Sequence, residues 1–280
     1  MTAVMLDGRS LALDLRQMLQ GEAARFAKSR GRAAHLALLV VGDDVSAAVF
    51  GQQVRRASRV IGVATSWISF AADVTESTIR AHVALASDDP ATDGVVVLLP
   101  LPASIRQRAV TEVLAPAKDV DGLGPRNAGN LMLGFPSFVP GTAEAAIELL
   151  RHADIPLRGR HAVIVGRSNV GGKPVALQFL RQDATVTLCH SQTRDLASIT
   201  RTADIVFVSV GRPGAITGAM LKPGAVVLDA GINRTPTGIV GDVDVATARD
   251  IAGWLTPVPG GLGPLTHLMV IRHTLLGPTP

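Results

Sequence analysis

The sequence predicts an α/β protein made of two α/β units in series. Short apolar runs typical of buried parallel strands alternate with segments whose apolar residues recur at helical spacing. This alternation stops between Ala115 and Pro140, where Pro, Gly and Asp gather, and it then resumes. A length of 280 residues also suits two domains better than one.

The sequence of the first unit predicts helices that alternate with strands. Apolar residues from Leu11 to Phe26 recur at helical spacing, and Gly31 follows as a C-terminal cap. Ser46 is expected to cap a helix that ends at Ile61, before Gly62. The remaining elements of this unit are strands at Leu36–Val41, Ala64–Phe70 and Gly94–Leu99, and helices at Glu76–Ala86 and Ile105–Leu114.

The second unit repeats the pattern over roughly Gly141–Thr256, and its sheet is again expected to be parallel. Pro257–Pro264 is a Pro/Gly loop, and Leu265–Leu276 is expected to form a closing helix. The strands are expected at His161–Val165, Thr185–Cys189, Ile205–Val210 and Ala225–Asp229, and the helices at Thr142–His152, Gly172–Arg181 and Asp195–Thr202.

Composition excludes several classes of protein. Hydrophobic residues make up 47% and charged residues 18% of the chain, so a disordered chain is excluded. The apolar runs are too short to cross a bilayer, and Met1–Ser10 lacks the features of a signal peptide. Cys189 is the one cysteine, so no internal disulfide can form and a cytoplasmic location is expected.

The net charge and the aromatic content limit the classes of ligand that the chain is expected to bind. The net charge of +4 is spread along the chain, and aromatic residues make up only 3%, so nucleic-acid binding is not expected. A modest positive field suits a small anionic ligand. The chain has no Tyr, which excludes the chemistry of short-chain dehydrogenases. No metal site is expected.

A nucleotide-binding turn is predicted where the strand His161–Val165 meets the next helix. Gly166, Arg167, Ser168 and Gly172 lie in this turn, and small residues there let a phosphate approach the backbone amides. The alternative is a tight turn whose glycines serve packing alone. The position of the turn, at the first strand of an α/β unit, favours the binding interpretation.

The end of the next strand favours NADP over NAD. An NAD site carries an acidic residue near this place, whereas this chain has His190, Ser191 and Arg194. These groups, with Arg167, can donate hydrogen bonds to the 2′-phosphate of NADP. They include no carboxylate that could accept from the free ribose hydroxyl of NAD. The alternative is that His190 and Arg194 are solvated loop residues.

Several motifs, taken together, resemble one family. The chain resembles the bifunctional methylenetetrahydrofolate dehydrogenase/methenyltetrahydrofolate cyclohydrolases of the FolD type over nearly its whole length. The motifs that carry the resemblance are, in order, Leu6-Asp7-Gly8, Lys118-Asp119-Val120-Asp121-Gly122, the turn Gly166–Pro174, Gly231-Ile232-Asn233, Gly241-Asp242-Val243 and Thr256–Pro264.

The resemblance implies two α/β lobes around a cleft, a homodimer, and a tetrahydrofolate derivative as substrate. Residues 1–140, with a helix at 265–280 packing back onto them, would form the folate-binding catalytic lobe. Residues 141–264 would form a Rossmann-like lobe that binds NADP. Gly211 and Ile232 would complete the cofactor site, and Pro259, Gly260 and Gly261 would border the substrate.

The family's catalytic pattern is altered in this chain. The resemblance places Phe50 at the family's Tyr, Val54 at its catalytic Lys and Leu98 at its Gln, and it keeps only Asp121, as the substrate anchor. Cyclohydrolase chemistry needs proton transfers that these side chains cannot make. Hydride transfer depends mainly on orientation. The loop expected as Pro-Cys-Thr-Pro also differs, as Pro140-Gly141-Thr142-Ala143.

Three hypotheses follow. The chain is an NADP-dependent methylenetetrahydrofolate dehydrogenase of one-carbon metabolism with weak or absent cyclohydrolase activity. Alternatively, it is a FolD-like paralogue with a shifted, less polar substrate. The third possibility is a protein that binds folate or NADP without catalysis. The second hypothesis predicts a pocket too apolar for a pterin, and the first depends on Asp121 reaching one.

Overall fold

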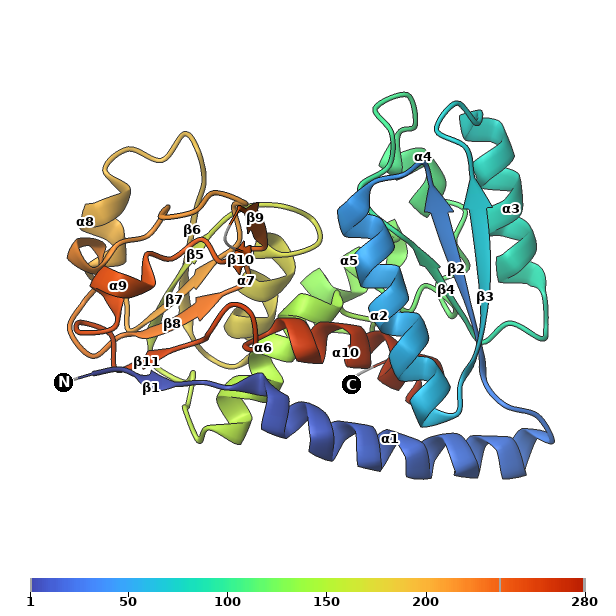
Figure 1. The fold of residues 1–280 in the computed structure, drawn as a ribbon, viewed down its shortest axis with the longest axis horizontal. Coiled ribbons are helices and arrows are strands. Elements are labelled where there is room, and N and C mark those ends of the chain that lie inside the picture. The colour runs from blue at the N-terminus through green and yellow to red at the C-terminus, as the bar shows by residue number, and fades with distance from the viewer. Residues whose placement is uncertain (1, 237, 279–280) are drawn as a thin grey trace. The chain divides into compact units, whose positions relative to one another are not determined.

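The computed structural model describes residues 2–236 and 238–278. The chain divides into two compact α/β units (Figure 1). The C-terminal unit comprises Thr142–Thr266 together with Met1–Ala12, and the N-terminal unit comprises Leu13–Gly141 together with His267–Pro280. The first twelve residues, expected in the first lobe, therefore lie with the second, because β1 (Val4–Met5) pairs with β11 (Trp254–Leu255).

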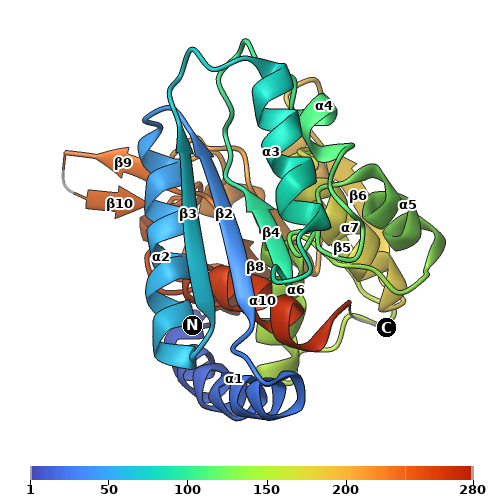
Figure 2. The ribbon, with the colours of Figure 1, turned by 90° about the vertical axis from the view of Figure 1, so that its right-hand side faces the viewer.

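The N-terminal unit has a three-stranded parallel sheet in the order β3-β2-β4. Its strands are β2 (His35–Val41), β3 (Ala64–Phe70) and β4 (Gly94–Val97). Helices α2 (Val45–Ile61) and α3 (Glu76–Asp88) cover opposite faces of the sheet (Figure 2). Apolar side chains bury both faces of the central strand, which explains why it is a continuous apolar run.

Two details of the helices differ from the prediction. Helix α2 is capped by Asp44, whose Oδ1 accepts the amide hydrogens of Ser46 and Ala47 at 2.9 Å each, and not by Ser46. Part of the stretch 115–140, expected to be irregular, forms helix α5 (Pro125–Leu133). A proline in its first turn and the left-handed Gly134 after its end mark this short helix.

The other predicted helices are present in their order, although two are shorter than expected. The short helical elements at Gly218–Met220 and Val245–Ala248 were not predicted. Helix α4 spans five residues of the predicted Ile105–Leu114, and α8 five of the predicted Asp195–Thr202. The helices are α1 (Gly8–Arg30), α4 (Gln107–Thr111), α6 (Gly141–His152), α7 (Gly172–Arg181), α8 (Leu196–Thr200), the 3₁₀ turn η1 (Gly218–Met220), α9 (Val245–Ala248) and α10 (Gly263–Leu276).

The C-terminal unit contains a six-stranded sheet in the order β1-β11-β8-β7-β5-β6, with every pairing parallel. Its four central strands are β5 (His161–Val165), β6 (Thr185–Cys189), β7 (Ile205–Val208) and β8 (Val226–Asp229). A separate antiparallel hairpin, β9 (Asn233–Thr235) with β10 (Gly238–Val240), was not predicted. Because the sheet is parallel, the loops that follow its strands gather at one edge, where such sheets bind ligands.

Within the described residues, no helix is long and apolar enough to cross a membrane.

Candidate functional site

The turn after β5 has the shape of a phosphate cradle. Gly166 has a φ of 127°, which favours glycine. A Cβ added to Gly172 would lie 1.7 Å from the carbonyl oxygen of Gly166, so no side chain fits there. The Ser168 hydroxyl accepts the amide hydrogen of Gly171 at 3.0 Å and fixes the turn before α7. Three of the predicted cofactor-binding residues, Gly166, Ser168 and Gly172, are therefore brought together.

The end of β6 offers hydrogen-bond donors. The Nδ1 of His190 accepts the amide hydrogen of Gln192 at 3.2 Å, so the neutral ring carries its proton on Nε2. Ser191 and Arg194 are exposed, as is Arg167 in the glycine turn. Residues 190–194 include no acid. This donor set fits the 2′-phosphate of NADP.

The loop after β7 is held by a buried carboxylate. Asp242 accepts the amide hydrogens of Val210 at 2.6 Å, Gly211 at 3.0 Å and Arg212 at 2.8 Å. The predicted cofactor-binding residue Gly211 is exposed beside it, and Ile232 is 68% exposed. Sequence reasoning gave Asp242 no role. Its signals were the motif Gly241-Asp242-Val243 and, within it, the glycine, which marks a close approach of backbone to another group.

The loop containing Pro259, Gly260 and Gly261 is braced by the start of the chain. The amide hydrogen of Gly8 goes to the Gly260 carbonyl oxygen at 2.9 Å, and Arg9 Nη2 donates to the Pro259 carbonyl oxygen at 3.0 Å. Gly8 also approaches Gly261 so closely that a Cβ there would lie 2.1 Å from its carbonyl oxygen. The sequence noted Leu6-Asp7-Gly8 as a motif but did not predict this contact.

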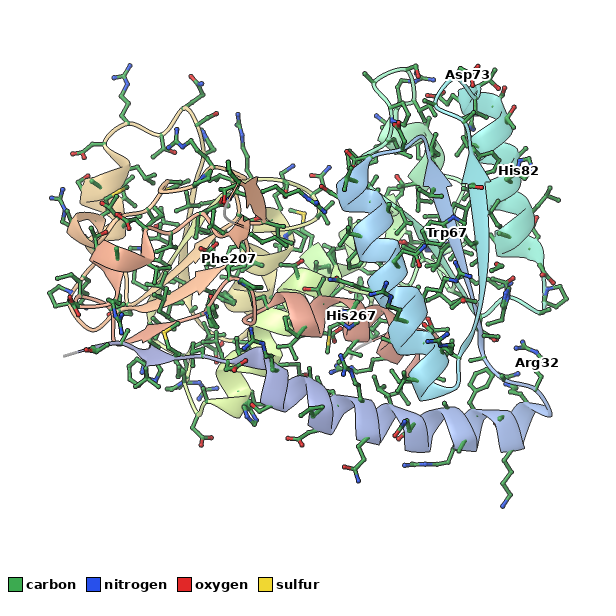
Figure 3. All side chains as sticks on the ribbon, viewed as in Figure 1. Arg32, Trp67, Asp73, His82, Phe207 and His267 are labelled. Carbon is green, nitrogen blue, oxygen red and sulfur yellow. The ribbon has the colours of Figure 1, made fainter. Side chains whose placement is uncertain are left out.

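In the N-terminal unit, we use the name apolar wall for five residues of α2, of β3 and of the segment directly after β4: Phe50, Gly51, Val54, Trp67 and Leu98. Val54 and Leu98 are 0% and 1% exposed, and Phe50 is half-buried. A Cβ on Gly51 would lie 2.5 Å from Leu98 Cδ1 and 2.8 Å from the Trp67 ring. Figure 3 shows Trp67 between α2 and the sheet. Sequence reasoning missed Gly51 and Trp67, because neither belongs to the family's catalytic pattern.

The side chains of the apolar wall contain no acid or base. The nearest cation on the same helix, Arg55, places its guanidinium 5.9 Å from the centre of the Trp67 ring. A guanidinium stays protonated in proteins, so Arg55 cannot act as a base. The wall therefore offers no side chain that could take up or release a proton.

Asp121 lies in a tight turn beside β4. Its neighbouring residues pair with that strand, where the amide hydrogen of Val95 goes to the Lys118 carbonyl oxygen at 2.7 Å. Gly122, at a φ of 63°, packs so closely on Phe138 that a Cβ would lie 2.4 Å from its carbonyl oxygen. Burial, together with the charge of Asp119, raises the pKa of Asp121 to about 7 against a hydrogen bond from the Gly141 amide.

Asp119 plays a different part in the same turn. Its carboxylate accepts the amide hydrogens of Leu123 at 3.0 Å and Gly124 at 2.8 Å, and the side-chain amide of Asn127 at 2.8 Å. Burial raises its pKa, and these three hydrogen bonds oppose the rise. Asp119 therefore stabilises the turn, whereas the one hydrogen bond that lowers the pKa of Asp121 comes from the Gly141 amide.

Residues 2–236 and 238–278 contain no group of three or more His, Cys, Asp or Glu side chains that could hold a metal ion.

Comparison with known proteins agrees with this arrangement. Residues 6–121 match the model of the tetrahydrofolate dehydrogenase/cyclohydrolase catalytic domain, and residues 140–277 match that of its NAD(P)-binding domain. The chain is 46% identical to the bifunctional protein FolD of Nocardia farcinica and 42% identical to that of Variovorax paradoxus, in each case over 98% of this chain and 97% of the relative.

Solved structures show the same fold. The FolD enzyme of Campylobacter jejuni superposes with a TM-score of 0.94 at 35% identity, covering 98% of each chain. The Trypanosoma brucei enzyme, solved with NADP and an inhibitor, has a TM-score of 0.93 at 35% identity, covering 98% of this chain and 97% of that one. The α/β fold with a Rossmann-like NAD(P)-binding domain is thus confirmed, and the chain belongs to the tetrahydrofolate dehydrogenase/cyclohydrolase family.

Proposed function

We propose that this chain catalyses only the dehydrogenase half of its family's chemistry. Membership of the family makes it an NADP-dependent methylenetetrahydrofolate dehydrogenase. The observation that supports the loss of the cyclohydrolase is the apolar wall, in which Val54 and Leu98 are buried and titratable groups are absent. The resemblance places the family's Lys and Gln at those two positions.

Hydrolysis of a methenyl group requires proton movement at two points. A base must take a proton from the attacking water, and an acid must give one to the nitrogen when the C–N bond breaks. Phe50, Val54 and Leu98 carry no proton that can move at neutral pH.

Hydride transfer places other demands on the protein. NADP, when bound, accepts the hydride that leaves the methylene carbon. The chain has to orient the folate and hold it still, and orientation alone supplies a large part of such rate enhancements. Asp121 supports this role, because its carboxylate can accept two hydrogen bonds from the amino-pyrimidine edge of a pterin. Pro259, Gly260 and Gly261 are proposed to border the same substrate, and Gly permits its close approach.

A second candidate is a paralogue that acts on a less polar substrate. The apolar wall is the observation that favours it. The two candidates differ at Asp121, because a substrate without an amino-pyrimidine edge would not need that carboxylate. Loss of binding of tetrahydrofolate in Asp121→Ala supports the dehydrogenase, whereas unchanged binding supports the paralogue.

We expect methenyltetrahydrofolate to hydrolyse no faster with the protein than in buffer, while NADPH forms from methylenetetrahydrofolate. Proton transfer contributes about 10²- to 10⁴-fold to such reactions, so its loss is easily measured. Absorbance follows both reactions on the same sample. Robust hydrolysis by the unmodified protein would contradict the proposal.

Val54→Lys alone is expected to restore little hydrolysis. The new ammonium would be buried beside Phe50 and Leu98 without a hydrogen-bond partner, and burial would lower its pKa. The triple change Phe50→Tyr, Val54→Lys and Leu98→Gln should exceed the sum of the singles, since the groups act as one unit. Equal rates for the single and triple variants would contradict this coupling.

NADP should bind more tightly than NAD. Arg167→Ala should weaken NADP about tenfold to hundredfold, because a charge-assisted contact to the 2′-phosphate is lost, and should leave NAD within about twofold. Calorimetric titration of both cofactors measures this. Arg201→Ala is the matched control, since Arg201 is an exposed arginine of the same unit whose Nε donates to Ala219. A preference for NAD, or equal losses for both cofactors, would refute the assignment.

Binding of tetrahydrofolate should strengthen as the pH rises through 7. The pKa of Asp121 is raised to about 7, so the carboxylate that accepts the pterin's hydrogen bonds is mostly protonated below that pH. Affinity at pH 6 should be about tenfold below its plateau at high pH. Asp121→Asn should bind weakly and without this pH dependence. Fluorescence titration between pH 6 and 8.5 tests both, and a flat profile in the wild type would oppose the role of Asp121.

We also propose, from the family resemblance, that the chain forms a homodimer and works in the cytoplasm. Sedimentation at micromolar concentration should show a species of twice the chain mass. A single species of 29.1 kDa would contradict the dimer.

A further inference from the structure

We propose that Asp242 is a positioning residue for the NADP site: its carboxylate holds the segment Val210-Gly211-Arg212 in the conformation that the cofactor meets. The inference rests on the proposed placement of NADP at this edge of the C-terminal sheet. Asp242 itself is fully buried and is not proposed to touch the cofactor.

One carboxylate receives four donors. Besides the three consecutive amide hydrogens of the segment, Asp242 Oδ1 accepts the side-chain amide of Asn233 at 2.8 Å. Three successive backbone amides that converge in this way form a concave anion site. Gly211 makes the curve possible, because its φ is 66°. The anion in this concavity is the protein's own side chain.

Asp242 is fixed in turn by a second buried carboxylate. Asp229, at the end of β8, accepts the amide hydrogens of Gly231 at 2.8 Å, Asp242 at 3.0 Å and Val243 at 2.9 Å. The amide hydrogen of Asp229 goes to the Thr256 hydroxyl at 2.7 Å, which ties in the end of β11. Asp229 and Asp242 thus connect the loops that follow β7, β8, β10 and β11.

The glycines of this region are required by the same contacts. A Cβ on Gly231 would lie 2.3 Å from Asp242 Cγ, and one on Gly241 would lie 1.9 Å from Asp229 Oδ2. No larger residue fits at either position without moving a carboxylate. The motifs Gly231-Ile232-Asn233 and Gly241-Asp242-Val243 therefore pack against each other around the carboxylates of Asp229 and Asp242.

This arrangement determines what the segment can offer a ligand. The amide hydrogens of Val210, Gly211 and Arg212 are all donated to Asp242, so they are not available to a phosphate. The other polar backbone groups of the segment are carbonyl oxygens, which accept from hydroxyl groups and repel phosphate. The segment adjoins the phosphate cradle, since a Cβ on Gly166 would lie 2.3 Å from the Ser209 carbonyl oxygen. It therefore suits a ribose next to the cofactor's phosphates.

The experiment compares Asp242→Asn with Asp244→Asn. The first change keeps the size of the side chain but turns an acceptor into an NH₂ group that faces amide hydrogens. The second removes the same charge two residues away, where Asp244 caps α9. Three quantities are measured for each variant: the affinity for NADP, the affinity for tetrahydrofolate, and the hydrogen exchange of the amides at 210–212 without cofactor.

We expect Asp242→Asn to speed exchange at 210–212 and to weaken NADP about tenfold or more, because buried donors lose their acceptor. Tetrahydrofolate affinity should stay within about twofold, and Asp244→Asn should match the wild type in both affinities. Fast exchange with unchanged NADP affinity overturns the proposal. Equal weakening of both ligands also overturns it, because the role would then be purely structural.

Asn233→Ala provides a milder test if Asp242→Asn does not fold. It removes one of the four donors to Asp242 and should weaken NADP about threefold, with tetrahydrofolate unaffected. No change in NADP affinity would overturn the proposal in that case. The wild-type titration separates the two levels of inference: if the unmodified protein binds no NADP, the proposed function fails rather than the role of Asp242.

Discussion

Buried aspartates that accept backbone amide hydrogens are the constraint on which the functional loops depend. These loops have no regular secondary structure, so their buried amide hydrogens need acceptors from elsewhere. A carboxylate provides about four acceptor sites on two atoms and can satisfy several amides of one tight loop. Asp119 does so in the N-terminal unit, and Asp229 and Asp242 in the C-terminal unit. Without them, the loops that bear the proposed ligand contacts would lose their shape.

Burial raises the pKa of three of the buried aspartates, and the number of hydrogen bonds that oppose the rise differs among them. Asp119 and Asp229 have raised pKa values, and in each case three hydrogen bonds oppose the rise. Asp121 has a single opposing hydrogen bond, from Gly141, and it also faces the charge of Asp119. Its pKa therefore reaches about 7, and its carboxylate keeps acceptor capacity that a ligand can use. A perturbed acid with spare acceptors is a candidate binding group, which is the role proposed for Asp121.

The sequence predicted the strands and helices whose periodicity is strong, and it missed several short elements, some of which depend on distant partners. β1 and β11 are two residues long each and exist because they pair across more than 240 positions of the chain. The glycine turn after β5 was predictable, since local φ and small size determine it. Asp242 was not, because its partners at 210–212 are about thirty residues away and no local pattern announces them. The role of Gly51 likewise appears only when Leu98 and Trp67 are seen against it.

The apolar wall explains why the loss of proton-transfer chemistry would be hard to reverse. Because Gly51 has no Cβ, Leu98 and Trp67 occupy the space beside helix α2. A decayed site would leave buried polar groups facing absent partners, at about 1–3 kcal/mol each. In the wall, the polar residues that the resemblance expects at positions 50, 54 and 98 are all replaced by apolar ones. No buried polar group among these three is therefore left without a partner. A lysine returned at position 54 would have to displace this packing before it could meet water. In the proposed function, Asp121 orients the folate and the residues of the wall do not, so the altered wall would separate two activities that the family combines.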